Sequence, residues 1–150
     1  MKRLLTLIAL LAVTLLNSYA KVELAPLFAD NMVLQRDSKA AIWGKAEPGA
    51  RVVITSTWAK GKTVVHADDQ GRWNVMLATP SAGGPHELTF NDGDRLTLKN
   101  ILIGEVWICA GQSNMEMTMR GFMGQPVEGA AELILTAKPS VPIRSCNLSR

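Results

Sequence analysis

The sequence predicts a β-sandwich that is followed by the first strand, helix and strand of an α/β domain. Short alternating runs separated by turn residues fill positions 21–103, which is the pattern of a sandwich. A continuous apolar run at 106–110 is typical of a strand buried on both faces of a parallel sheet. We therefore divide the chain into residues 1–20, a β domain at 21–103 and an α/β segment at 104–150.

Residues 1–20 have the composition of a bacterial secretory signal peptide. Lys2 and Arg3 precede an apolar stretch from Leu4 to Leu16, and a small-residue end at Ala20 follows. This apolar stretch is shorter than the roughly twenty residues that a membrane-spanning helix needs. We expect cleavage after Ala20, export to the periplasm or the cell exterior, and no stable membrane span afterwards. An uncleaved anchor is the alternative.

The charge of the chain gives no indication of a nucleic-acid partner. The sequence has 16 Lys and Arg against 13 Asp and Glu, but two of the basic residues lie in the predicted signal peptide. The remainder has 14 basic and 13 acidic residues, a net charge of +1. It contains no basic cluster with interleaved aromatic residues, so no nucleic-acid interface is expected.

The β domain is predicted from alternation of apolar and polar residues between turn signals. The turns are expected at 47–49, 68–71, 82–85 and 91–94. One face of each strand should be buried and the other wet. The apolar residues that share a face are Val52, Ile54 and Trp58, then Trp73, Val75 and Leu77, then Leu88 and Phe90, then Leu96 and Leu98.

A serine follows directly after the continuous apolar run. Gly111 breaks the run, and Ser113 then lies where a strand passes into a turn or helix. Open α/β sheets place their chemistry at this edge, beside outward-pointing backbone N–H groups. Ser113 is therefore the candidate nucleophile. The alternative is a capping box, because Ser113 and Glu116 also fit the pattern S-x-x-E.

The residues around Ser113 resemble a known family. Gly-Glu-Val-Trp from Gly104 and Gly-Gln-Ser-Asn-Met from Gly111 resemble the nucleophile block of the sialate O-acetylesterases, a branch of the SGNH (GDSL-like) serine esterases. The resemblance implies that Ser113 attacks an acetyl ester of a carbohydrate and that its own N–H donates to the oxyanion. Gln112 and Asn114, with Gly111, are expected to support the turn.

A second block strengthens this resemblance. The segment from Leu24 to Arg36 is similar to the opening of the same family, in which a β-rich domain precedes the esterase. The segment from Gly44 to Ile54 resembles bacterial immunoglobulin-like modules, so the sandwich is expected to be immunoglobulin-like. The two specific blocks bound a resemblance that extends from Leu24 to Met117.

The α/β segment is expected to be incomplete. A helix is predicted from Glu128 to Lys138, ending before Pro139, and a second strand at 141–148. Two strands and one helix cannot cover both faces of a parallel sheet. We therefore expect the amino-terminal part of a longer esterase, or an oligomer that completes the sheet. Four methionines between 115 and 123 are interpreted as core filler, with an acyl-pocket wall as the alternative.

The catalytic base is not recognisable in this sequence. A serine nucleophile needs an adjacent base, usually histidine. The resemblance implies an Asp-x-x-His block near the carboxyl end, and no such block follows Met117. His66 and His86 fall in the predicted sandwich. We expect the chain alone to be inactive. The alternatives are an acetylxylan-type esterase of the same family and a non-catalytic carbohydrate-binding or surface module.

No cofactor or metal site is expected. Cys109 and Cys146 permit one disulfide, although free thiols buried in the predicted strands are favoured. The dispersed histidines and cysteines do not form a zinc site, and a hairpin turn explains Asp68 and Asp69 better than calcium does. Trp58, near the turn at 60–62, is the tryptophan most suited to stack on a sugar; the other three are expected in the core.

Overall fold

The computed structural model describes residues 21–138 and 142–147. The chain divides into two compact units, the first ending at Glu105 and the second beginning at Val106. The predicted signal peptide at 1–20 lies outside the described residues. Within the described part of the chain, no helix is long and apolar enough to cross a membrane.

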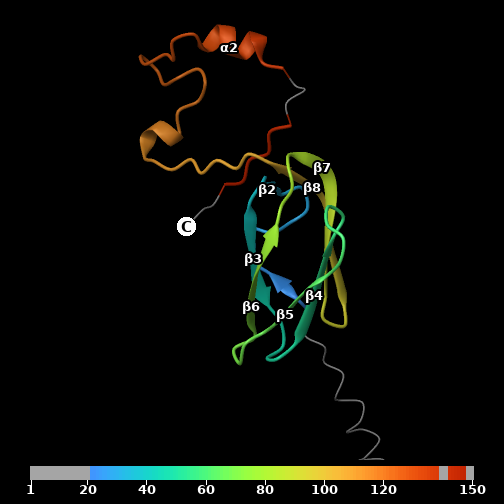
Figure 1. Cartoon of the computed structure of the whole chain (residues 1–150). Helices are drawn as coiled ribbons and strands as arrows, with labels where there is room; N and C mark the ends of the chain where they lie inside the picture. The colour runs from blue at the N-terminus through green and yellow to red at the C-terminus, as the bar shows by residue number, and fades with distance from the viewer. Residues whose placement is uncertain (1–20, 139–141, 148–150) are drawn as a thin grey trace, which may run out of the picture. The chain divides into compact units, whose positions relative to one another are not determined.

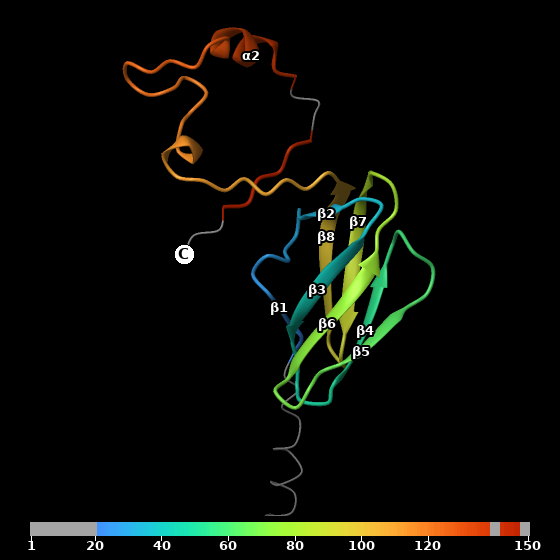
Figure 2. The ribbon, with the colours of Figure 1, turned by 60° about the vertical axis from the view of Figure 1, so that its left-hand side comes forward.

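The first unit is built from two β-sheets (Figures 1 and 2). The antiparallel three-stranded sheet has the order β1-β3-β6 and consists of β1 (Glu23–Leu24), β3 (Lys39–Lys45) and β6 (Arg72–Ala78). The five-stranded sheet has the order β2-β8-β7-β4-β5 and consists of β2 (Val33–Gln35), β8 (Arg95–Gly104), β7 (Gly83–Asn91), β4 (Arg51–Ser56) and β5 (Thr63–His66). Its neighbours are antiparallel except β2 and β8, which run parallel.

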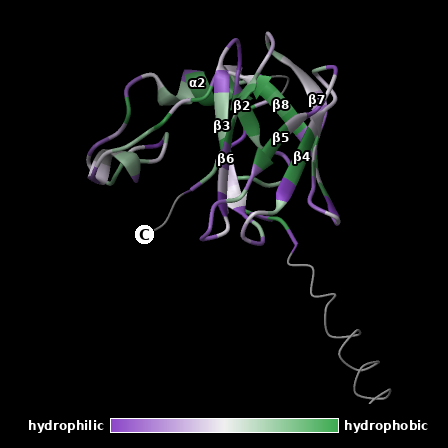
Figure 3. Cartoon of the chain, turned by 60° about the horizontal axis from the view of Figure 1, so that its bottom comes forward, coloured by the Kyte–Doolittle hydropathy of each residue, from purple (hydrophilic) through white to green (hydrophobic). Residues whose placement is uncertain are grey.

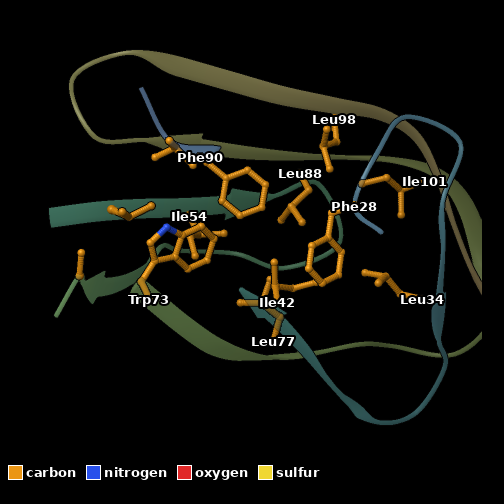
Figure 4. Close-up of a cluster of buried hydrophobic side chains, with 13 residues drawn as sticks. Phe28, Leu34, Ile42, Ile54, Trp73, Leu77, Leu88, Phe90, Leu98 and Ile101 are labelled. Carbon is orange, nitrogen blue, oxygen red and sulfur yellow. The ribbon is translucent and has the colours of Figure 1, made fainter. Parts of the chain in front are cut away.

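One hydrophobic core is shared by the two sheets, and Figure 4 shows side chains of both sheets pointing toward one another. The ring of Trp73 on β6 lies 5.7 Å from that of Phe90 on β7, centroid to centroid. Figure 3 shows the hydrophobic residues running along β4, β5 and β8. The core consists of Val22, Phe28, Leu34, Ile42, Val52, Ile54, Ala67, Trp73, Leu77, Leu88, Phe90, Leu98 and Ile101.

The burial predicted from alternation is confirmed for most of the first unit. Every strand expected from an alternating run is present, and its inward residues lie in the core or pack against it. Trp43 is an exception, because its neighbour Ile42 takes the inward position in β3 and is fully buried. The Trp43 ring packs edge to face on Phe28 instead, with centroids 4.7 Å apart. The expectation that Trp43 lies in the core is therefore wrong.

The apolar run at 101–104 belongs to the first unit. It forms the end of β8, between β2 on one side and β7 on the other. Leu98 and Ile101 are both buried although they are three residues apart. The positive φ of Asn100 (56°) and the shift of register opposite His86 insert one extra residue at this point. Because of this bulge, Ile101 and Ile103 point into the core as Leu98 does. The strand therefore does not follow strict alternation over its whole length.

The second unit differs from its predicted form. Its described residues contain a 3-10 helix, η1 (Ser113–Met115), an isolated bridge between Phe122 and Gln125, and α2 (Ala130–Thr136). Helix α2 lies within the predicted helix. The described residues form no strand at 106–110 or at 142–147, so the predicted strand-helix-strand unit is not formed there. Residues 141 and 148, the ends of the predicted second strand, lie outside the described residues.

Exposure gives the physical reason for this difference. A strand of the doubly buried type needs neighbouring strands and a layer on each face. In the described part of the second unit no residue is buried, and Trp107 and Ile108 are 83% and 93% exposed. Met115, Met119 and Met123 are also exposed, so their interpretation as core filler is wrong for this structure.

Candidate active site

The two sequence blocks that carry the family resemblance meet at their ends. Strand β2 ends the first block and pairs in parallel with the end of β8, so that Gln35 lies opposite Gly104. Beyond the strand, the backbone N–H of Arg36 donates to the Gly104 carbonyl at 2.9 Å. The long-range pairing therefore places the end of the first block beside the start of the segment that leads to Ser113.

A carboxylate closes this junction. Glu105 accepts hydrogen bonds from Gln35 Nε2 at 3.0 Å and from Arg36 Nε at 2.6 Å, one on each carboxylate oxygen. The Gln35 hydrogen bond, followed by that of Arg36, lowers the pKa of Glu105 below its ordinary value. The hydrogen bond to Glu105 and the negative charge of Glu105 raise the pKa of Arg36. The charge of Asp37, whose Oδ2 lies 3.3 Å from Arg36 Nη1, raises it further. We name Gln35, Arg36 and Glu105 the exit cluster.

A buried threonine holds the backbone at Gln35 of the exit cluster. Thr79 Oγ1 donates toward the Gln35 carbonyl at 2.6 Å, lies 3.1 Å from the Ser38 carbonyl, and accepts from the Ser38 N–H at 3.1 Å. Thr79 is only 7% exposed, and these bonds satisfy its hydroxyl and fix the turn after β2. The turn after β2 is thus held by both backbone and side-chain contacts.

The structure places Ser113 at the surface, at the start of η1. The Ser113 carbonyl accepts from the Glu116 N–H at 3.0 Å, and the Gln112 carbonyl accepts from the Met115 N–H at 2.9 Å. Within the described residues, the Ser113 hydroxyl has no hydrogen-bond partner. The Glu116 N–H, which a capping box would direct to the hydroxyl, is used by the carbonyl instead.

The neighbouring residues of the motif form the same tight turn. Gly111 is exposed, and a Cβ on it would lie 3.0 Å from Cγ of Met115, so that a side chain here would press on the methionine. Gln112 is exposed and supplies the carbonyl that closes η1. Asn114 is the central residue of η1.

The two histidines lie in the first unit, as the sequence predicted. His66 ends β5 opposite Arg51. His86 belongs to β7, where its Nδ1 lies 3.3 Å from Thr57 Oγ1 and its ring meets Trp58 edge-on at 5.6 Å. The sequence after Glu105 contains no histidine. The second unit therefore presents a serine hydroxyl without an imidazole of its own.

Among the described residues, the two cysteines are free, and the acidic turn at Asp68 is held by local hydrogen bonds. Cys109 and Cys146 are both free and exposed, so the expectation that they are buried is wrong, because the strands that would bury them are not formed. No group of three or more His, Cys, Asp or Glu among the described residues could hold a metal ion. The Asp68 carboxylate accepts from the N–H groups of Gln70 and Arg72 and from Arg72 Nε. The hydrogen bond from the Arg72 backbone is the main cause of the lowered pKa of Asp68, and the other bonds add to it. Hydrogen bonds of this kind are typical of a turn.

Sequence reasoning did not identify the exit cluster. Gln35 and Arg36 end one block and Glu105 lies in the other, 70 and 69 positions away. The available signal was the position of polar residues directly at the ends of two blocks that share one resemblance. Their contact depends on the parallel pairing of β2 with β8, which nothing in the local pattern specifies.

Comparison with known proteins identifies relatives of this region. No family model matches the chain. The sialate O-acetylesterase of Mus musculus is 38% identical over 104 residues, which covers 61% of this chain and 19% of the mouse protein. The human sialate O-acetylesterase is 38% identical over 101 residues, covering 60% of this chain and 19% of the human protein.

A solved structure gives the same result. A carbohydrate acetylesterase from Xanthomonas citri has a TM-score of 0.61 and 37% identity, over 66% of this chain and 23% of that one. This chain thus spans about a fifth of the length of the curated relatives that it matches. Over that region the chain is similar to the sialate O-acetylesterases, as its two sequence blocks predicted.

Proposed function

We propose that this chain carries the nucleophile segment of a secreted carbohydrate O-acetylesterase, with Ser113 as the nucleophile. The observation that carries the proposal is the state of the Ser113 hydroxyl, which is exposed and has no partner among the described residues. The names of the relatives support an acetylated carbohydrate as the substrate. Acetyl groups on sialic acid or on a plant polysaccharide such as xylan both fit this class.

The chemistry assigned to Ser113 is acyl transfer. Its Oγ attacks the acetyl carbonyl carbon, a base takes the hydroxyl proton, and the sugar leaves as an alcohol after it is protonated. Water then hydrolyses the acetyl-serine and releases acetate. Ser113 is the first residue of η1, where a backbone N–H has no partner within the helix. That N–H is the donor that we assign to the oxyanion, while Gly111, Gln112 and Asn114 shape the turn.

The base is proposed to come from residues that this chain does not contain. The two histidines of the chain are part of the first unit, and the matched region is only 19% of the curated relatives. We infer that the complete esterase supplies an Asp-x-x-His block and further oxyanion donors. Without them the chain is expected to be inactive, because loss of the base alone costs about a million-fold in turnover.

The finer architecture belongs to the same proposal. We infer that the two sheets with their shared core form an immunoglobulin-like sandwich, and that 104–150 are the start of an SGNH-type esterase domain. The exposed apolar residues of the second unit, among them Trp107 and Ile108, are then the surface that the rest of that domain covers. We also propose export to the periplasm or beyond, directed by residues 1–20.

A chimera tests the proposed function. Residues 24–117 replace the similar region of the Xanthomonas citri acetylesterase, and hydrolysis of p-nitrophenyl acetate and release of acetate from acetylated xylan are measured. The chimera is expected to be active, and Ser113→Ala to lower its turnover by about a million-fold. Ser81→Ala, an exposed serine of the transferred region that lies outside the two blocks, is the matched control in the chimera and should leave its activity unchanged. A folded, active chimera that keeps its activity after Ser113→Ala would contradict the proposal.

A further inference from the structure

A cavity of about 150 Å³ opens between the two sheets of the first unit, beside the loop that joins β4 and β5. Its floor is apolar and comes from both sheets. Ile54 and Leu88 contribute from the five-stranded sheet, and Leu77 contributes from the three-stranded sheet. These three side chains are among the buried residues of the core. The cavity is therefore an opening into the core, with a floor that the fold itself fixes.

Trp58 forms one wall of this cavity, and its ring is held in place. The indole Nε1–H donates to the Ala78 carbonyl at 3.0 Å, which ties the loop after β4 to the end of β6 in the other sheet. His86 meets the ring edge-on, with centroids 5.6 Å apart. Trp58 is half-buried and packs against the core. A fixed, partly exposed aromatic wall is suited to contact the C–H face of a sugar ring.

Two lysines lie at the rim. Lys60 and Lys62 line the cavity, and both are exposed. Within the described residues neither forms an ion pair, and no acidic side chain is among the lining residues. Gly61 lies between them with a φ of 98°, a conformation that favours glycine and turns the chain sharply. The rim thus presents positive charge without a partner, which a carboxylate would complement.

The volume of the cavity fits part of one sugar ring. A protein cavity of about 150 Å³ holds a group of the size of benzene, so a sugar ring would enter in part and leave its carboxylate at the rim. We propose that this cavity binds the carboxylated sugar unit of an acidic glycan, with the ring against Trp58 and the carboxylate between Lys60 and Lys62. All of the lining residues belong to the first unit, so the site includes no residue of the second unit and the proposal does not depend on the proposed esterase activity.

The test compares two sugars that differ only in the carboxylate. Methyl β-D-glucuronide and methyl β-D-glucoside are titrated into the ¹⁵N-labelled full chain, and the shifts of the Trp58 indole N–H and the Gly61 amide are followed. We expect saturable shifts with the glucuronide and binding about fivefold weaker with the glucoside, since two exposed ion pairs are lost. Raising the salt concentration should reduce the difference.

Variants assign the effect to the rim. The double variant Lys60→Gln, Lys62→Gln should bind the two sugars equally weakly, whereas Lys39→Gln and Lys45→Gln, on exposed positions of β3, should bind as the parent does. Trp58→Phe keeps an aromatic wall and should retain the preference for the glucuronide. Equal binding of both sugars by the parent chain, no shift with either, or full preference in the double variant would each overturn the proposal. Ser113→Ala should leave binding unchanged.

Discussion

Two apolar runs lie on either side of Glu105 and have opposite environments. Ile101 and Ile103, on its amino side, are 0% and 2% exposed, whereas Trp107 and Ile108, on its carboxyl side, are 83% and 93% exposed. Hydrophobicity alone does not distinguish them. The first run lies between β2 and β7 and above a shared core. The second has no paired strand among the described residues. In this chain, an apolar run is therefore buried only where neighbouring strands and a core are present to cover it.

The largest expected effect contrasts the two units directly. Phe90→Ala removes a fully buried ring that packs on Trp73, and it should lower the free energy of unfolding by about 3–5 kcal/mol. Leu135→Ala removes an apolar side chain of α2 that is 84% exposed, and it should change stability by less than about 0.5 kcal/mol. Urea unfolding followed by tryptophan fluorescence gives both values. Similar losses for the two variants would contradict the contrast.

A smaller loss is expected where the first unit leaves no room for a side chain. A Cβ on Gly44 would clash with the Glu23 carbonyl oxygen and come within 2.9 Å of the Trp73 ring. Gly44→Ala should therefore cost about 1–3 kcal/mol, with loss of hydrogen-exchange protection in β1 and β3. Gly83→Ala is the control, because the nearest atom to its Cβ lies 3.9 Å away. If Gly44→Ala is as stable as the parent chain, β1 is not packed as closely on β3 as the structure shows.

The exit cluster should make stability depend on pH. Because hydrogen bonds from Gln35 and Arg36 lower the pKa of Glu105, the ionised carboxylate stabilises the folded state. That contribution is present above the ordinary pKa of 4.5 and is lost as pH falls through the lower folded value. Stability of the parent chain should thus fall more steeply below pH 4.5 than that of Glu105→Gln. Since the cluster is exposed, the difference should shrink at high salt. Parallel curves at low salt would contradict the assignment.

The smallest expected change in stability is at Ser113. Its hydroxyl has no partner among the described residues. Ser113→Ala should therefore leave the far-ultraviolet circular dichroism unchanged and change the free energy of unfolding by less than about 0.5 kcal/mol. A capping role would instead cost about 1 kcal/mol, the usual effect of removing such a side chain. A loss of that size would favour the capping box over the nucleophile.

These contrasts explain how much of the fold was accessible from sequence. A strand with one buried face is encoded by its own alternation, which is why Trp73, Leu77, Leu88 and Phe90 were placed correctly. The bulge at Asn100 and the parallel pairing of β2 with β8 depend on contacts across the chain, and local patterns do not contain them. The prediction of a strand at 106–110 was wrong for the same reason, because the described residues include no strand that pairs with it and no layer that covers it.

The candidate site was predictable only in part. Ser113 was identifiable because its motif is rich in uncommon residue types, and the structure leaves its hydroxyl accessible. The exit cluster was not predictable, since Glu105 meets Gln35 and Arg36 only after the sheet has formed. The activating base could not be assigned to His66 or His86 from position alone, and both lie in strands of the first unit.

Mapping of a covalent adduct tests the central claim most directly. The chimera is treated with a fluorophosphonate, which reacts with activated serine nucleophiles, and digested peptides are analysed by mass spectrometry. One adduct per chain on Ser113 is predicted, with no adduct on the unfused chain, because we propose that the base comes from residues outside that chain. An adduct on a different serine of the chimera, with Ser113 unmodified, would contradict the assignment.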